Sequence, residues 1–233
     1  MCPISVETKL TLPIDWTDDV FLPFNYSHTA FIYNTKKVTN PPISFDALVN
    51  SNIDLSLVIQ DPRSSISGLA LVLWVKAVYG DKAEKVWEKL APKILTVTKG
   101  WSESYGLFSA GEVDMVLSYT TSPAYHILAE GDLTKKAAIF PEGHYLMVEL
   151  AAKVAKTDVP NLANAFMAFI LTERFQNLIP VGNWSLPSAL PKNKWPEGFQ
   201  ELSMPENVLF YSEEDAANLR KEAIEEWRRA LSQ

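Results

Sequence analysis

The sequence predicts an α/β fold built around a largely parallel sheet. Between Leu55 and Phe140, short apolar runs rich in β-branched residues alternate with segments of helical pattern. Consecutive strands joined through helices lie side by side and point the same way. The chain has 233 residues, of which 47% are hydrophobic and 21% charged, so it can bury a sizeable core as one large domain or two small lobes.

The N-terminal part is predicted to be poor in helix. Residues 1–19 lack periodic hydrophobic residues and form a loop or connector. Phe21–Phe24 and Thr29–Tyr33 are predicted to be two short strands, because aromatic and β-branched residues dominate them. A short helix is expected at Ser44–Leu48.

The central part carries the strand and helix alternation. Strands are expected at Leu55–Ile59, Ile94–Thr98, Met115–Tyr119 and Lys136–Phe140. Helices are expected from Ser65 or Ser67 to about Tyr79, and at Asp81–Leu90, Trp101–Ala110 and Ser122–Glu130. The first of these helices is apolar on nearly every face, which predicts an interior position.

The C-terminal part is less regular. Tyr145–Lys156 fits either a strand or a helix, and the pattern leaves both open. A long helix is predicted at Asn161–Asn177, between two prolines. A second helix is predicted at Ser212–Gln233, where Ser212 and Asp215 approximate a capping box.

Three predicted corners between a strand and a helix combine hydroxyl groups with aromatic rings. They are Gln60–Gly68, Lys99–Glu103 and Ser118–Tyr125. Because ligands of open α/β sheets bind beyond the carboxyl ends of the strands, we expect all three corners on one edge of the sheet. Ring faces, hydroxyls and helix N-termini there predict a binding site for a small organic molecule.

Composition narrows the class of partner. The formal net charge of −7 argues against nucleic acid and anionic membrane surfaces, and it is compatible with a cationic ligand. The single cysteine, Cys2, excludes an internal disulfide and a cysteine-based metal site. No basic segment followed by an apolar stretch opens the chain, so no signal peptide is expected in it. The longest apolar run, Leu69–Val75, is too short to span a bilayer.

Catalytic chemistry finds little support. The three histidines, His28, His126 and His144, lack metal-ligand spacing, and no nucleophile motif or Gly-rich nucleotide loop is present. Asp61 and Arg63 flank a proline, and we interpret them as an ion pair that stabilises the turn rather than as a catalytic acid with its partner. The sequence therefore predicts no catalytic residue and no metal ligand.

Four segments carry a resemblance to a known family: Gln60–Gly68, Thr96–Tyr105, Leu117–His126 and Gln176–Pro187. They closely resemble the thiamine-binding periplasmic proteins of bacterial ABC importers, and the resemblance runs from about Asp18 to the C-terminus. It implies a type II periplasmic-binding-protein fold, in which two lobes joined by crossing strands close on thiamine or its phosphates.

The resemblance also implies a division of the chain. Residues 1–24 are expected to be a remnant of lobe 1 and the first crossover, and residues 25–141 to be lobe 2 with a parallel-rich sheet. Residues 142–203 are expected to hold the second crossover and the rest of lobe 1. The C-terminal helical segment, 204–233, is expected to pack on lobe 2.

Residue by residue, the resemblance implies the following ligand contacts. Ser64, Ser65 and Ile66 fall on the loop for the phosphate or hydroxyethyl end, where Ile66 replaces a hydroxyl residue. Trp101 falls on the tryptophan beside the thiazolium. The second contact run is Tyr119, Thr120, Thr121 and Ser122, with Tyr125 and Trp184 on aromatics near the pyrimidine.

The function implied is that of a non-enzymatic substrate-binding component, without a cofactor. It would bind thiamine, its monophosphate or its diphosphate, deliver it to a membrane permease in the periplasm, and be a monomer when full length. Alternatives are a solute-binding protein for another small cation or phosphorylated compound, of the polyamine, phosphonate or iron type, and a truncated fragment without function. An enzyme acting on thiamine analogues would need a nucleophile such as cysteine, and Cys2 lies in the unmatched N-terminal tail.

One departure from the family is large. About the first quarter of a mature member has no counterpart, including an acidic residue followed by glycine that would recognise the aminopyrimidine. A mis-assigned start, a fragment, or a partner chain that supplies the rest would each explain it. An incomplete first lobe predicts weak thiamine binding and a tendency to aggregate, because sheet edges and apolar surface would be left uncovered.

Overall fold

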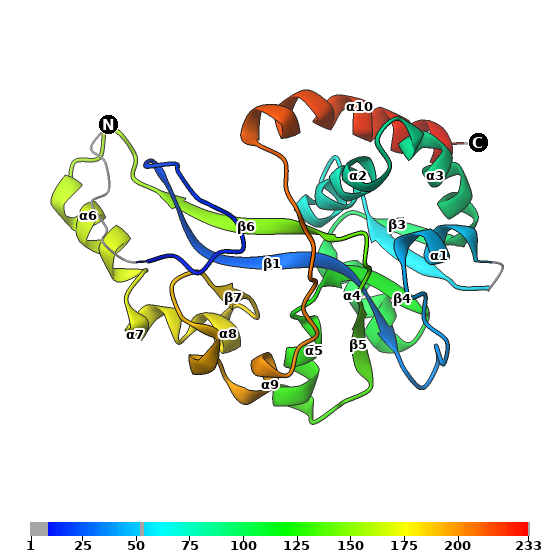
Figure 1. The fold of residues 1–233 in the computed structure, drawn as a ribbon, viewed down its shortest axis with the longest axis horizontal. Coiled ribbons are helices and arrows are strands. Elements are labelled where there is room, and N and C mark those ends of the chain that lie inside the picture. The colour runs from blue at the N-terminus through cyan, green and yellow to red at the C-terminus, as the bar shows by residue number, and fades with distance from the viewer. Residues whose placement is uncertain (1–8, 52–53, 233) are drawn as a thin grey trace. The chain divides into compact units, whose positions relative to one another are not determined.

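The computed structural model describes residues 9–51 and 54–232. The chain forms two compact units, each assembled from two segments. Unit 1 comprises Met1–Ser27 and Met147–Leu202, and unit 2 comprises His28–Leu146 and Ser203–Gln233. Two strands, β1 (Phe21–Asn34) and β6 (His144–Ala152), contribute residues to both units (Figure 1).

Unit 2 has the predicted α/β architecture, but its sheet is mixed rather than largely parallel. Strands β3 (Ile94–Thr98), β2 (Leu57–Gln60) and β4 (Met115–Tyr119) are parallel neighbours in that order. The next strand, β1, runs antiparallel to β4 and also pairs antiparallel with β5 (Lys135–Ala138). The prediction rested on Leu55–Phe140, and β1, which precedes that range in the chain, joins the sheet beside β4 in the opposite direction.

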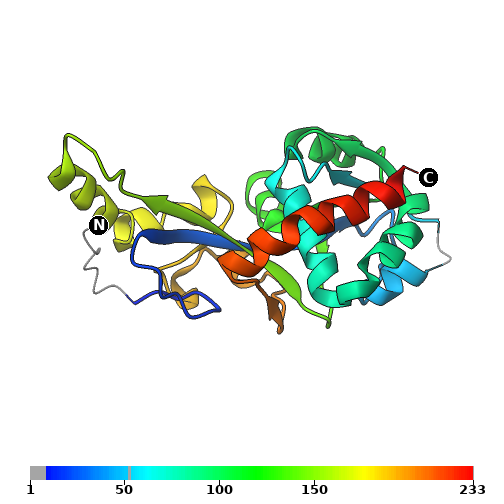
Figure 2. The ribbon, with the colours of Figure 1, turned by 90° about the horizontal axis from the view of Figure 1, so that it is seen from above.

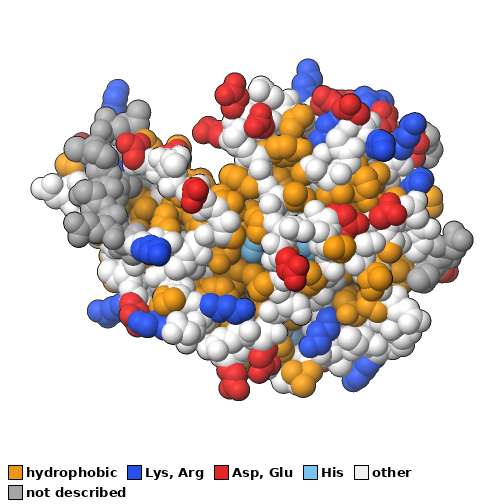
Figure 3. All heavy atoms as spheres, viewed as in Figure 1, with side chains coloured by type: hydrophobic (Ala, Val, Ile, Leu, Met, Phe, Trp, Pro, Cys, Tyr) orange, Lys and Arg blue, Asp and Glu red, His pale blue; other side chains and the backbone are white. Residues whose placement is uncertain are grey.

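Three helices of unit 2 pack against one another. Helix α10 (Glu213–Leu231) contacts both α2 (Ile66–Tyr79) and α3 (Ala83–Leu90), and Figure 2 shows it crossing them. Charged side chains of both signs gather along α10 at the surface (Figure 3). Helix α3 buries Ala83, Val86, Trp87 and Leu90, and α2 is buried along most of its length, as predicted.

The remaining elements are shorter. Unit 2 also contains α1 (Phe45–Asn50), α4 (Trp101–Ala110), α5 (Ser122–Tyr125), a π-helical turn at His126–Glu130, β8 (Val208–Leu209), and 3₁₀ turns at Gly80–Lys82 and Ala91–Lys93. Unit 1 contains α6 (Pro160–Phe169), α7 (Glu173–Gln176), α8 (Ile179–Gly182), β7 (Leu186–Pro187), a 3₁₀ turn at Lys192–Lys194 and α9 (Glu197–Gln200).

Two of the predicted N-terminal strands are in fact one. The 14-residue strand β1 continues through the polar residues Asn25, Ser27 and His28, which lie between the two predicted strands. All three side chains are buried, so they belong to the interior of the fold and not to a turn. The prediction failed because burial of polar residues cannot be read from hydrophobic alternation.

Two predictions in the C-terminal part are settled differently. The ambiguous segment is strand β6, which ends at Ala152. The expected long helix at Asn161–Asn177 is broken after α6, since Thr172 has extended backbone and its hydroxyl caps a new helix by accepting a hydrogen bond from the N–H of Phe175. A capping residue inside a helical pattern thus starts a second, separate helix.

A helix in the central part also differs from its prediction. The helix expected at Ser122–Glu130 is α-helical only to Tyr125 and then widens to a π-turn.

The core of unit 2 is aromatic. Trp74 is fully buried, and its ring centroid lies 4.6 Å from that of Phe45 and 5.8 Å from that of Phe140. Its indole N–H donates to the carbonyl of Gly143 over 2.9 Å. His144 completes the cluster: its Nε2 accepts from the N–H of Phe140 at 2.8 Å, so its Nδ1 carries the proton that is donated to a backbone carbonyl of β1.

Helix α2 approaches β2 closely at Gly68, in its first turn, and a substitution there tests this approach. A Cβ atom there would lie 2.4 Å from the carbonyl oxygen of Gln60. We expect Gly68→Ala to lower the free energy of unfolding by roughly 1–3 kcal/mol, because the backbone would have to move apart. Gly106→Ala is the matched control, since a Cβ in α4 at that position meets nothing within 4 Å, and it should stabilise by about 0.5–1 kcal/mol. Equal urea midpoints for the two variants would contradict this close approach.

The buried histidines predict acid sensitivity. Burial lowers the pKa of His28 from its ordinary value of 6.5 to about 3, with a smaller contribution from His144. Between about pH 6.5 and 3 the unfolded chain therefore binds a proton that the folded chain does not, so the free energy of unfolding falls as the pH falls through this window. Each pH unit is worth up to about 1.4 kcal/mol for this one group.

Urea unfolding at several pH values between 7.5 and 4.5 measures this effect. We expect His28→Gln to show a shallower loss of stability with acid than the unaltered chain. Equal slopes for the two proteins would assign the acid sensitivity to other groups.

Candidate ligand site

The three corners predicted from the sequence meet at one edge of the unit 2 sheet. Because β3, β2 and β4 are parallel and Gln60 lies opposite Thr98, their carboxyl ends share that edge. Hydrogen bonds join the loops that follow. The hydroxyl of Ser64 donates to the carbonyl of Lys99 at 2.8 Å, and the hydroxyl oxygens of Ser67 and Tyr119 lie 2.9 Å apart.

Gln60, the last residue of β2, links the elements at this edge through hydrogen bonds of its side chain. Its side chain is buried, and its Nε2 donates to the carbonyl of Leu117 at 3.1 Å and to the hydroxyl of Ser104. That hydroxyl in turn donates to the carbonyl of Trp101 at 2.8 Å. One amide thus connects β2 to β4 and to the first turn of α4.

Trp101 stands at the start of α4 with its ring held on two sides. Its indole N–H donates to the hydroxyl of Ser118 at 2.8 Å, and its ring stacks on Tyr105 with centroids 4.6 Å apart and planes 25° apart. The side chain remains 38% exposed. The hydroxyl of Ser122 lies 2.7 Å from that of Ser118, so two predicted site residues share one hydrogen-bond chain.

The loop before α2 presents hydroxyls and backbone N–H groups. Ser65 is the N-cap residue in extended conformation, yet its hydroxyl makes no capping hydrogen bond. Ile66 begins the helix and is 69% exposed. The N–H groups of a first helical turn have no acceptor within the helix, and the helix dipole favours an anion there.

The run after β4 divides into buried and exposed residues. Thr120 and Thr121 are buried, and the N–H of Thr120 donates to the carbonyl of His28 at 2.9 Å. Tyr125 is 38% exposed, and its ring packs nearly perpendicular to that of His126, with centroids 5.3 Å apart. Of the five predicted residues in this run, Tyr119 and Tyr125 thus have the more accessible side chains.

Trp184 is the one predicted site residue in unit 1. Its φ of 52° lies in the left-handed region, which non-glycine residues rarely adopt. Its ring stacks on that of Phe199, with centroids 6.5 Å apart and planes 14° apart. Strained backbone is typical of functional positions, and the remaining nine predicted residues lie in unit 2.

The sequence interpretation missed four residues that shape this edge: Gln60 as a tie, and Tyr105, His126 and Glu130 behind the exposed rings. Tyr105 and His126 are buried and linked by a 2.9 Å hydrogen bond between the phenol oxygen and Nε2. A helical spacing of four, from Trp101 to Tyr105 and from His126 to Glu130, was a usable signal, since residues so spaced are neighbours on a helix face.

Among the residues that the structure describes, one group of side chains has ligand atoms near enough for a metal ion. Ligand atoms of His126, Glu130 and Asp132 lie within 4.8 Å of one another. Within the described residues, however, each already has a protein partner. Asp132 pairs with Lys135 at 2.9 Å, and hydrogen bonds from Thr134 and Lys135 hold the pKa of Asp132 well below its usual value. The arrangement is explained without a metal.

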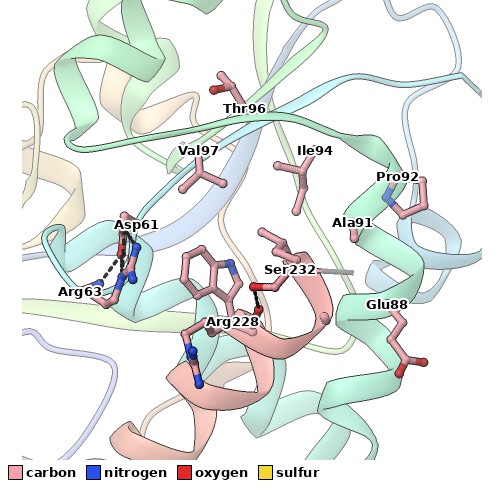
Figure 4. A pocket seen from close by; sticks show the side chains of 13 residues that line it. Asp61, Arg63, Glu88, Ala91, Pro92, Ile94, Thr96, Val97, Arg228 and Ser232 are labelled. Atoms are coloured by element: carbon pink, nitrogen blue, oxygen red, sulfur yellow. Dashed lines mark hydrogen bonds and ion pairs between the residues drawn. The ribbon is translucent and has the colours of Figure 1, made fainter.

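A cavity of about 880 Å³ lies elsewhere in unit 2, beside the C-terminal turn of α10 (Figure 4). Its lining includes Asp61 and Arg63, and the guanidinium lies 5.6 Å from the ring centroid of Trp227. The side-chain hydrogen bond from Arg63 is the main cause of the lowered pKa of Asp61. This confirms Asp61 and Arg63 as an ion pair within the turn, and none of the ten predicted site residues lines the cavity.

Across the described residues, no helix is both long and apolar enough to cross a bilayer.

The role of Gln60 gives a prediction for the edge. Gln60→Met keeps the size of the side chain but removes its N–H donors, leaving the carbonyl of Leu117 and the hydroxyl of Ser104 without this partner. We expect a loss of about 1–3 kcal/mol in the free energy of unfolding. Urea denaturation measures it, and an unchanged midpoint would show that Gln60 does not tie the edge together.

Comparison with known proteins gives a consistent result. Residues 7–185 match the family described as bacterial extracellular solute-binding protein. This match begins upstream of Asp18, near which the sequence resemblance was expected to start. The chain is 49% identical over 223 residues to the thiamine-binding periplasmic protein of Escherichia coli K12, covering 96% of this chain and 68% of that protein. It is 43% identical over 226 residues to the thiamine-binding periplasmic protein of Brucella abortus, covering 97% of this chain and 68% of that one.

A solved structure described as a periplasmic thiamin binding protein superposes with a TM-score of 0.93 at 47% identity, covering all of this chain and 73% of that one. The predicted periplasmic-binding-protein fold is thereby confirmed. The chain belongs to the family of bacterial extracellular solute-binding proteins, and its sequence groups it with the thiamine-binding periplasmic proteins of that family.

Proposed function

We propose that this chain is the substrate-binding component of an ABC importer, which binds thiamine in the periplasm and delivers it to a membrane permease without catalysing a reaction. The observation that carries the proposal is the Trp101 face, fixed at the sheet edge beside the start of α2. The names of the relatives, at 42–49% identity, support the same ligand.

The chemistry of thiamine fits the residues at this edge. Its thiazolium ring is a permanent cation, and a cation over an indole or phenol face gains about 0.5–2 kcal/mol per ring. Trp101 and Tyr125 each keep 38% of their surface exposed, so both offer such a face. Seven tryptophans are present, but Trp74 and Trp87 are fully buried in the core and offer none.

The other end of the ligand requires an anion site or a hydroxyl partner. The hydroxyls of Ser64 and Ser65 and the first-turn N–H groups of α2 suit the hydroxyethyl arm of thiamine or a phosphate attached to it. Ile66 supplies a backbone N–H but no hydroxyl. We therefore propose that the chain binds thiamine and its phosphates, and that the start of α2 binds the hydroxyethyl or phosphate end.

Tyr119, Thr120, Thr121, Ser122 and Trp184 complete the proposed contacts. Thr120 and Thr121 are buried in this structure, so their part is to shape the edge and not to offer a broad surface. Trp184 lies in unit 1 and stays a prediction from the sequence resemblance.

Titration calorimetry tests the ligand. We expect the chain to bind thiamine weakly, and a chimera that adds the part of the E. coli relative it does not span to bind with micromolar affinity or better. A spermidine competitor and a phosphonate competitor separate the alternative solutes. A chimera that gives no heat with thiamine, its monophosphate or its diphosphate would contradict the proposal.

Replacing the central ring tests the site. Trp101→Ala should weaken thiamine binding by roughly tenfold or more, because it removes a cation–π contact and its packing. Phe210→Ala is the matched control, as Phe210 is an exposed ring of unit 2 with a similar exposure of 42%. Equal dissociation constants for the two variants would remove Trp101 from the site.

A further inference from the structure

Both exposed rings of the proposed site rest on the same buried pair of side chains. Trp101 stacks face to face on Tyr105, and the ring of Tyr125 packs nearly perpendicular to that of His126. Tyr105 and His126 are themselves stacked, with centroids 5.9 Å apart and planes 16° apart. The two faces that would meet a cation are therefore positioned by one common support.

A carboxylate lies at the far end of this support. Nδ1 of His126 is 2.6 Å from an oxygen of Glu130, four residues later, and Glu130 is exposed. A carboxylate only accepts hydrogen bonds, so Nδ1 carries a proton. In the neutral imidazole Nε2 is then an acceptor, and the Tyr105 hydroxyl, 2.9 Å away, is its donor.

The protonation state of Tyr105 agrees with this direction. Burial raises the pKa of Tyr105 well above its usual value of 10, so its hydroxyl keeps the proton that it donates. The chain of hydrogen bonds runs from the Tyr105 hydroxyl to His126 and from His126 to the Glu130 carboxylate. Each donation shifts electron density toward the donor, and hydrogen bonds in series strengthen one another.

We infer that Tyr105, His126 and Glu130 are positioning residues that orient the Trp101 and Tyr125 faces and make this edge selective for a cationic over a neutral heterocycle. This inference rests on the proposed function. It concerns the side chains that lie behind the proposed contact residues, to which the proposed function assigns no role. The selectivity follows because attraction of a cation to a ring is electrostatic, and the negative end of the chain adds to it.

The experiment compares two ligands on three variants. The ligands are thiamine and an isostere in which a neutral thiophene replaces the thiazolium. The variants of the chimera are Glu130→Gln, which removes the charge but keeps hydrogen-bonding capacity, Tyr105→Phe, which keeps the ring but removes the hydroxyl, and Glu112→Gln, an exposed acid at the turn after α4, as the control.

We expect Glu130→Gln and Tyr105→Phe to raise the dissociation constant for thiamine by about fivefold, and to change that for the neutral isostere by less than about twofold. Glu112→Gln should leave both constants unchanged. Equal weakening of both ligands would reduce the three residues to a purely structural role and overturn the inference, as would unchanged thiamine affinity.

A ligand-free measurement separates failure of the inference from failure of the proposed function. Nitrogen NMR should show His126 protonated at Nδ1, and Glu130→Gln should shift the indole N–H resonance of Trp101. If the unaltered chimera does not bind thiamine, the proposed function fails, and the inferred orienting role stands or falls on this spectrum alone. A Trp101 resonance that is unmoved in Glu130→Gln overturns it.

Discussion

The parallel register of β3, β2 and β4 is the constraint on which the rest of the site depends. It brings the carboxyl ends of three strands to one edge, although the loops that follow them lie some 20 to 60 residues apart in the chain. Gln60 fixes that register from inside through its contacts with Leu117 and Ser104. Neither Trp101 nor Ser65 has a functional position unless these strands end together.

The proposed site offers two different means of recognising charge, and they do not compete. Ring faces at Trp101 and Tyr125 attract a cation through the quadrupole of the aromatic system. The start of α2 attracts an anion or a hydroxyl through oriented N–H groups. A molecule with a cationic ring and a polar or phosphorylated arm satisfies both, whereas a polyamine would need carboxylates among the ten proposed contact residues, and none of them is acidic.

The sequence predicted the local structure well where one signal dominated. Strands β3 and β4 and helix α4 have the predicted bounds, and Gly111 ends α4 with a positive φ of 78°, as a C-cap glycine should. Predictions failed where tertiary context decides: β1 continues through buried polar residues, and Thr172 interrupts an apolar helical pattern. The contact residues came from family motifs. The motifs Thr96–Tyr105 and Leu117–His126 also contain the buried pair Tyr105 and His126, but the sequence assigned these two residues no role, because a support behind a site is defined by packing.

The most direct measurement is fluorine NMR of the chimera labelled with 5-fluorotryptophan, with Trp101 assigned by its loss in Trp101→Phe. The account predicts that thiamine shifts the Trp101 signal strongly while the signals of the core residues Trp74 and Trp87 stay in place. Thiamine binding that leaves the Trp101 signal unmoved would contradict it.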